Sequence, residues 1–445
     1  MTNKKQKIYS KDWMALHPYQ GSARTDLYYT TVANKIYAIL DDLLENEVPE
    51  EDFFYLTEDE KKQLSCTLAS YFEDIISQAG IFRAFTKEHK RMYNSPLPFF
   101  TCKEYADDEI NLEDVQFLIW HYFMQLNYGQ IPYSPETPLF ALMAEKVMEI
   151  LDEEYESAPE NEKLKEFFIL PEKEQTNLYS LQARFAWLAT ESYLFQFNGR
   201  QMQEEVNDMV ETAKENGTEE YLPDMVNVLC NDFAYNLITE FMQHSPAQWL
   251  AILLGEDHPA YDALINLSRK YSGYFDFVDE DEYNARFRHI ITGEIIEVTK
   301  KSMKGFPADM KSDDVSLYAG FVRWQNEWWI MGLVNTYPKS AALTEEIDKR
   351  AEEESHIFEE KSELPENEQE IILKDILDDT ALEEGEEPLT PQETAWIALL
   401  DDELSVPFMK KAVKENNIPG LSFDGENGTE LLHNNLDFIL CYIKR

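Results

Sequence analysis

The chain has 445 residues, 44% of them hydrophobic, and its 86 acidic residues outnumber 39 basic ones to give a formal charge of −47. This length exceeds the ~100–200 residues of one ordinary domain, so about two to four structural units are expected. The negative field repels nucleic acid and anionic membranes and attracts basic partners. Acidity that serves only solubility is the alternative interpretation of the same charge.

Helical periodicity dominates residues 1–273, which we predict to form one α-helical domain of roughly eight to ten helices. In TEDEKKQLSCTLASYFEDIISQAG, Thr57 and Glu60 form a capping box, apolar residues recur at helical spacing, and Gly80 ends the helix. The stretch NLEDVQFLIWHYFMQLNYG is apolar almost all round and is predicted to lie in the middle of a bundle.

Familiar signatures of catalysis are missing from the sequence. Phosphate-binding GxxxxGK[ST], GxGxxG, GxSxG and HExxH are all absent, and the four cysteines form no CxxC pair. The carboxylates of YADDEINLED, residues 105–114, could bind a hard cation, but carboxylates at a helix N-terminus are also favoured by the helix dipole. We adopt the structural interpretation, and predict no catalytic residue, no cofactor and no metal ligand.

The apolar period changes from 3.6 to 2 at Tyr274. The short segments YFDFV, ARFRHII, EIIEVT, LYAGFVRW and EWWIMGLVN are rich in β-branched and aromatic residues and are separated by turn residues. Residues 274–338 are therefore predicted to form a small five-stranded antiparallel β-barrel of SH3-like or OB-like kind.

Three tryptophans lie within six positions of the last two segments, at 324, 328 and 329. A turn at Gln325-Asn326 places Arg323 opposite Trp328 and makes both faces of the hairpin apolar. We therefore predict core tryptophans that also contact the helical domain. The alternative is a stacking platform of exposed Trp328 and Arg323, with a small positive face nearby that includes Arg288 and His289.

Acidity is concentrated in residues 344–387, which contain 19 acidic and 4 basic residues. We predict an acidic connector over 339–388 and a helical C-terminal module over 389–445. Within the connector, Ile371, Ile372 and Ile376 recur at helical spacing and are expected to dock on the body of the protein or on a partner. The candidate binding surface thus comprises Arg323, Trp328, Arg288, His289, Ile371, Ile372 and Ile376.

Stretches along nearly the whole chain carry a family resemblance: KIYSKDWMALHPYQ with TDLYY, SYFEDIIS, INLEDVQFLIWHY, EKVMEILDEEYESAPEN, HIITGEIIEVTKKSM with RWQNEWWIMG, and NNLDFILCYIKR. In this order they resemble an uncharacterised domain-of-unknown-function family of Bacteroidetes. The resemblance implies that the helical domain, the barrel and the part of the chain after the barrel form one family unit. It implies no reaction, cofactor or catalytic residue.

Together these observations predict an α+β protein that is cytoplasmic, because no apolar run is long enough for a signal-peptide core or a membrane span. The leading hypothesis is a non-enzymatic protein-binding module, an adaptor or inhibitor, that engages a basic protein. The alternative is an enzyme without a familiar motif that uses acidic residues and a divalent metal in the helical domain. Nucleic acid is an unlikely partner because the chain lacks Lys and Arg in the numbers that phosphate contacts need. The sequence leaves the oligomeric state open.

Overall fold

Helices make up the first part of the chain, as predicted. The structure is a computed structural model and describes residues 7–46, 55–126 (except 94, 99, 101 and 103), 135, 137–303 (except 240 and 243), 308–355 and 358. Twelve α-helices precede the first strand in this described part: α1 (Ser10–Met14), α2 (Asp26–Asn46), α3 (Glu58–Ser77), α4 (Ile81–Tyr93), α5 (Leu112–Leu126), α6 (Pro138–Tyr155), α7 (Glu162–Phe168), α8 (Leu178–Thr190), α9 (Gln196–Asn216), α10 (Leu222–Asn236), α11 (Pro246–Leu254) and α12 (Tyr261–Ile265). Three of them have only five to seven residues, too few to show clear periodicity, which explains the lower predicted number.

The predicted capping box of α3 is confirmed, but the left-handed residue that ends the helix is Gln78 and not the predicted Gly80. The Thr57 hydroxyl accepts from the Glu60 backbone N–H, and the Glu60 carboxylate accepts from the Thr57 backbone N–H. The helix ends at Ser77, where Gln78 adopts a left-handed conformation, and Gly80 follows with a φ of +88°. These groups satisfy backbone atoms that have no partner inside the helix.

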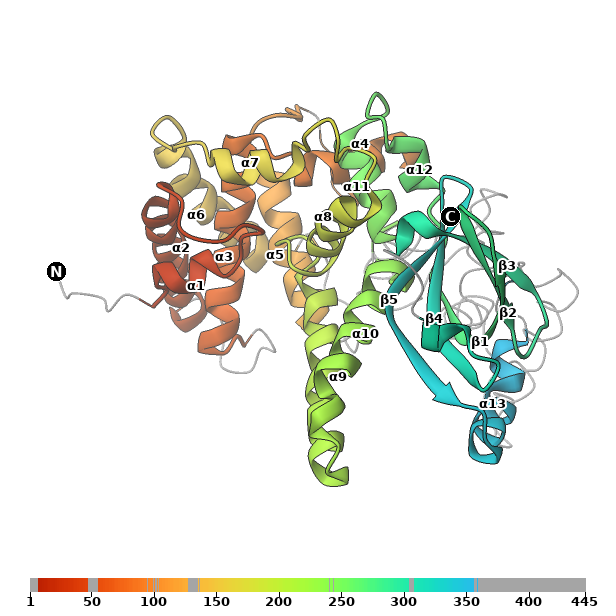
Figure 1. The fold of residues 1–445 in the computed structure, drawn as a ribbon. Coiled ribbons are helices and arrows are strands. Elements are labelled where there is room, and N and C mark those ends of the chain that lie inside the picture. The colour runs from red at the N-terminus through yellow and green to blue at the C-terminus, as the bar shows by residue number, and fades with distance from the viewer. Residues whose placement is uncertain are drawn as a thin grey trace, which may run out of the picture.

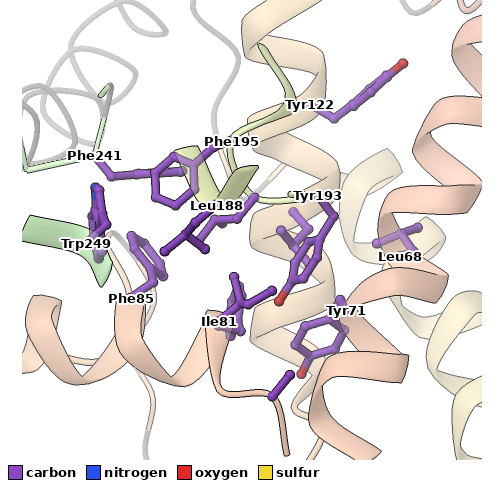
Figure 2. Packing of buried hydrophobic residues seen from close by; sticks show 14 of the residues in the cluster. Leu68, Tyr71, Ile81, Phe85, Tyr122, Leu188, Tyr193, Phe195, Phe241 and Trp249 are labelled. Carbon is purple, nitrogen blue, oxygen red and sulfur yellow. The ribbon is translucent and has the colours of Figure 1, made fainter. Parts of the chain in front are cut away.

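Aromatic side chains fill the centre of the helical region. Figure 2 shows Phe85, Phe195, Phe241 and Trp249 around Leu188, and the ring of Phe241 lies 4.7 Å from that of Phe85 and 5.5 Å from that of Phe195. Most of α5 is buried, which confirms its predicted central position. None of the helices in the described part is both long and apolar enough to cross a lipid bilayer.

Five strands follow, as predicted: β1 (Tyr271–Glu280), β2 (Asn284–His289), β3 (Ile295–Thr299), β4 (Val315–Trp324) and β5 (Glu327–Pro338). They pair in the order β1-β2-β3-β5-β4, and β4 pairs back to β1, so the sheet closes on itself. The expectation of a purely antiparallel sheet is wrong, because β3 and β5 run parallel where Val298 pairs with Trp328. This pairing joins strands that are not consecutive, which alternation along the sequence cannot predict.

The first strand begins at Tyr271, three residues before the predicted change of period. Gly273, a typical turn residue, lies inside this strand. A Cβ at this position would lie 2.7 Å from His289 Nε2, so the glycine allows the imidazole to pack directly against the strand.

The predicted register of the tryptophan hairpin is confirmed: Arg323 pairs with Trp328 across a turn in which Gln325 and Asn326 both have positive φ. Val322, Trp324 and Met331 belong to the buried cluster of the helical region. Residues of the opposite face, Phe321 and Ile330, belong to the cluster inside the sheet. The hairpin is therefore buried on both faces, and one of them holds the sheet against the helices.

The acidic stretch that follows the sheet begins with a helix, α13 (Ala341–Glu354). Leu343 and Ile347 of this helix pack in one cluster with Tyr274 of β1. Figure 1 shows α13 beside the sheet. The predicted segment with Ile371, Ile372 and Ile376, and the helical module predicted for 389–445, lie outside the described residues.

Candidate functional site

Two residues of the predicted binding surface, Arg323 and Trp328, are neighbours across the β4–β5 hairpin. Arg323 is exposed, but Trp328 is half-buried and packs into the interior cluster of the sheet. Its ring makes edge contacts with Tyr271 at 5.5 Å and Phe358 at 6.2 Å. Because those contacts cover the indole, Trp328 is better placed as a packing residue than as an open stacking platform.

The other two described members, Arg288 and His289, point to opposite sides of β2. Arg288 is exposed, whereas His289 is fully buried. The two ring nitrogens of His289 lie 3.0 Å from Thr292 Oγ1 and 3.3 Å from Glu354 Oε2 of α13. His289 therefore contributes to the docking of α13 and not to an exposed surface.

Basic side chains on the sheet are engaged by carboxylates. Arg286 pairs with Asp279, and its Nη1 lies 3.6 Å from Asp281. Other lysines of the sheet and its loops make equivalent ion pairs, namely Lys300–Glu280 at 3.1 Å, Lys301–Glu327 at 2.7 Å and Lys339–Asp276 at 3.0 Å. Most of the local positive charge that nucleic acid would need is thus neutralised, and among the described residues only the exposed Arg288 and Arg323 of the strands make no ion pair.

A different surface, which we call the acidic hairpin, consists of α9, α10 and the residues between them, 196–236. Figure 1 shows α9 extending away from the rest of the helical region, with α10 alongside. The hairpin has two basic residues, Arg200 and Lys214, against nine acidic ones: Glu204, Glu205, Asp208, Glu211, Glu215, Glu219, Glu220, Asp224 and Asp232. In the part of the chain that the structure describes, only Asp232 of these nine makes an ion pair, with Lys270.

Apolar side chains accompany these carboxylates. Tyr221 and Met225 are 57% and 37% exposed, and Met202, Val206 and Met209 of α9 are half-buried. Methionine side chains are flexible and polarisable, and they adapt to partner surfaces of different shape. The acidic hairpin therefore combines unpaired negative charge with accessible apolar area.

A cavity of about 360 Å³, which we call the α3 pocket, lies elsewhere in the helical region. One face of α3 lines it with residues at three- and four-residue spacing: Asp59, Lys62, Gln63, Cys66, Thr67, Ser70, Glu73 and Asp74. The other walls come from α1 and its flanks, α4, α7, α8 and the first residue of α9. The spacing of apolar residues predicts the apolar face of α3 but not this polar one.

Two buried carboxylates form the floor of the pocket. Glu73 accepts from Asn161 Nδ2 at 2.9 Å and lies 2.8 Å from His17 Nε2. Asp74 accepts from the Tyr193 hydroxyl at 2.7 Å and from the backbone N–H groups of residues 80–82 at the start of α4. Both carboxylates therefore have a structural role and are fully engaged.

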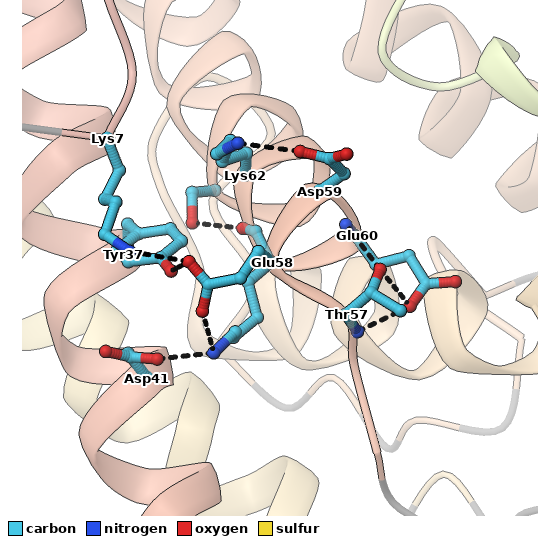
Figure 3. A network of polar contacts seen from close by, with 10 residues as sticks. Lys7, Tyr37, Asp41, Thr57, Glu58, Asp59, Glu60 and Lys62 are labelled. Carbon is cyan, nitrogen blue, oxygen red and sulfur yellow. Dashed lines mark hydrogen bonds and ion pairs between the residues drawn. The ribbon is translucent and has the colours of Figure 1, made fainter.

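At the rim, Asp59 and Lys62 form an ion pair at 2.7 Å, drawn in Figure 3. The figure also shows Glu58 bound to Lys7 and to the Tyr37 hydroxyl, contacts that fasten the N-terminal segment to α2 and α3. Burial, followed by the nearby Asp12 carboxylate, raises the pKa of the Cys66 thiol to about 12. Cys66 is therefore protonated near neutral pH and is a poor nucleophile.

In the acidic run at residues 105–114, Asp114 has a structural role. This carboxylate is buried and accepts from the hydroxyls of Tyr71 and Tyr105, at 2.7 and 2.8 Å, and from Asn111 Nδ2 at 3.1 Å. Burial raises the pKa of Asp114 to about 7, although these three hydrogen bonds act to lower it. Across the described residues, no group of three or more His, Cys, Asp or Glu side chains is arranged to hold a metal ion.

The fold and sites define the class: an α+β protein in which a helical region with a polar pocket packs against a closed, mixed five-stranded sheet. The chain belongs to the family described as Protein of unknown function (DUF3843), whose family model matches residues 7–289. The match thus includes every helix before the sheet and ends with β2, inside the sheet. No curated protein and no solved structure matches the chain.

Proposed function

We propose that the protein is a non-enzymatic binding module, an adaptor or inhibitor, that engages a basic protein through the acidic hairpin. One observation carries this proposal: eight of the nine hairpin carboxylates make no ion pair in the described part of the chain, whereas most basic residues of the sheet are paired with carboxylates. A basic partner supplies the missing positive charge. Electrostatic complementarity of this kind raises the association rate and selects among partners.

The accessible apolar side chains of the hairpin support a helical segment as the bound element. An amphipathic helix binds by placing its apolar face in a groove, with anchors one turn apart. Tyr221, Met225 and the half-buried methionines of α9 offer such apolar area between the carboxylates. A partner helix with Lys and Arg beside its apolar face fits both properties.

The test uses the full-length protein with four hairpin carboxylates neutralised: Glu211→Gln, Glu215→Gln, Glu219→Gln and Glu220→Gln. A matched control neutralises four carboxylates on and just after α6: Glu145→Gln, Asp152→Asn, Glu153→Gln and Glu156→Gln. The tagged proteins are purified from lysate of the source cells at ~150 mM salt, where long-range attraction is screened. Co-purifying proteins are quantified by mass spectrometry, and the affinity of the captured partner is then measured with purified components.

We expect a basic partner with wild type and with the α6 control, and an affinity at least about tenfold lower with the hairpin variant. If no basic protein co-purifies with wild type, the binding-module proposal fails. If binding survives in the hairpin variant but is lost on deletion of residues 359–387, the partner binds the acidic connector instead.

The alternative, an enzyme that uses a divalent metal in the helical region, is the weaker candidate. The buried carboxylates Glu73, Asp74 and Asp114 are occupied by protein donors, which leaves them poorly suited to bind a metal. Thermal unfolding with Mg²⁺, Mn²⁺ or Zn²⁺ tests it. A midpoint that rises with metal concentration would favour the enzyme, because a ligand that binds the native state stabilises it.

The finer classification of the sheet is also part of this proposal. Of the two kinds of barrel expected, the order β1-β2-β3-β5-β4 with a parallel β3–β5 contact favours the OB-like one. Such barrels bind oligonucleotides on the face of strands 2 and 3. On this face Arg286 is held by Asp279 and Asp281, so we propose a protein partner and not a nucleic acid.

A further inference from the structure

We propose that the α3 pocket is a binding site for a small organic amine with an apolar body, separate from the acidic hairpin. Its volume of about 360 Å³ lies within the range of ~300–1,000 Å³ typical of small-molecule sites. Amine binding here does not require the protein partner, because the pocket shares only Gln196, the first residue of α9, with the acidic hairpin.

The charge of the pocket determines which ligand charge it can bind. Five carboxylates line it, from Asp12, Asp59, Glu73, Asp74 and Glu191. The single lysine of the lining is already bonded to one of them, Asp59. An anionic ligand would be repelled by this excess, whereas an ammonium group would be attracted by it.

The carboxylates divide into two roles. Glu73 and Asp74 are only 1% exposed and are saturated by protein donors, so they contribute a fixed negative field at the floor. Asp12 and Glu191 are exposed, so their carboxylates remain accessible for direct contact with an ammonium group near the rim. An amine can thus be held at the mouth while its body enters the cavity.

The walls are suited to that body. Ile8, Leu16, Ile81, Leu164 and Trp187 provide apolar surface, and burying a small aryl or alkyl group against them contributes ~25 cal/mol per Å². This contribution explains why a bare inorganic cation is a poorer candidate than an organic amine.

Two ring nitrogens of residues on the lining are buried without a protein partner in the part of the chain that the structure describes. Trp187 is 8% exposed and the His17 side chain 4%, yet Trp187 Nε1 and His17 Nδ1 have no hydrogen-bond partner among the described residues. Buried polar atoms are almost always satisfied, and an exception needs a water or a ligand to explain it. Neither nitrogen is open to the cavity, so a ligand in the pocket reaches them only when neighbouring side chains move.

The experiment compares three probes of one skeleton with the full-length protein: phenethylamine, neutral 2-phenylethanol and anionic phenylacetate. Binding is followed by calorimetry at ~150 mM salt, where weak attraction to the acidic surface is screened. We expect saturable one-to-one binding of the amine, at least about tenfold tighter than the alcohol, and no binding of phenylacetate. Equal affinity for all three probes, or no binding of the amine, would overturn the proposal.

Two pocket variants locate the site. Glu191→Gln removes a rim charge, and Ser70→Leu fills space next to α3 without a change of charge. Both should weaken phenethylamine binding by about threefold or more, whereas Glu145→Gln on α6, a matched loss of an exposed charge outside the pocket lining, should not. Urea unfolding of each variant establishes that it is folded.

Amine binding that all three variants retain would be general attraction to the acidic chain and would overturn the proposal. Binding of Nα-acetyl-lysine amide without binding of phenethylamine would also overturn it. In that case the pocket would receive a lysine side chain of a protein partner.

Discussion

Asp114 gives a quantitative prediction, because its carboxylate is buried and its pKa is raised from the ordinary 3.8 to about 7. Above pH 7 the folded protein must hold this charge away from water, while the unfolded chain ionises it freely. The folded state therefore binds more protons than the unfolded state between about pH 4 and pH 7. The contribution of Asp114 to the unfolding free energy is therefore fully present below about pH 4 and is lost as the pH rises to about 7.

The full loss of folding stability is about 4 kcal/mol, because each unit of difference between the folded and unfolded pKa values corresponds to about 1.36 kcal/mol. Most measurements will fall between pH 5 and pH 8, over which the same relation gives a loss of ~2–3 kcal/mol. Asp114→Asn keeps the shape of the side chain and removes the titration. As the pH rises from 5 to 8, the unfolding free energy of wild type should therefore fall by ~2–3 kcal/mol relative to that of Asp114→Asn.

The assay is urea unfolding at pH 5, 6, 7 and 8, extrapolated to zero urea for both proteins. Glu145→Gln removes an exposed carboxylate on α6 and controls for the general effect of lowering the negative charge. Parallel pH profiles for wild type and Asp114→Asn would refute the reasoning, because they would mean that Asp114 ionises in the fold as easily as in the unfolded chain.

Three further variants test packing and capping by urea unfolding. Gly199→Ala should destabilise the protein by at least ~2 kcal/mol, because the new Cβ would lie 2.0 Å from the Thr190 carbonyl oxygen. This clash outweighs the better helix propensity of Ala. A gain in stability would contradict the prediction. Trp324→Ala should cost ~3–5 kcal/mol, since it removes a fully buried indole between sheet and helices, and a cost below ~1 kcal/mol would show that this contact is dispensable. Thr57→Ala should cost ~0.5–2 kcal/mol and speed hydrogen exchange at the Glu60 amide, whereas Thr57→Ser should change neither.

Features set by neighbouring residues were predictable from the sequence. The capping box at Thr57 depends on residues three apart, and the register of the tryptophan hairpin follows from one two-residue turn. The alternation of apolar residues then placed Trp324 in a buried position. Local chemistry alone decides each of these features.

The α3 pocket could not be predicted in the same way, because its polar groups meet partners far along the chain. Glu73 binds Asn161, 88 residues away, and Asp74 binds Tyr193, 119 residues away. Before those contacts are known, charged residues on α3 are indistinguishable from a solvated face. The parallel pairing of β3 with β5 is non-local for the same reason. One sequence signal did exist: Glu73, Asp74 and Ser77 interrupt the face that packs inward.

The helix α9 belongs to both sites described above. Its first residue, Gln196, lines the α3 pocket and donates to Thr67 at 2.7 Å, and its later turns carry the acidic hairpin. With 21 residues the helix is ~31 Å long, so a rotation of ~5° at the pocket displaces its far end by ~3 Å. The helix is thus a direct physical connection between the pocket and the hairpin carboxylates. If pocket occupancy alters partner affinity through this helix, the partner must alter pocket affinity by the same factor.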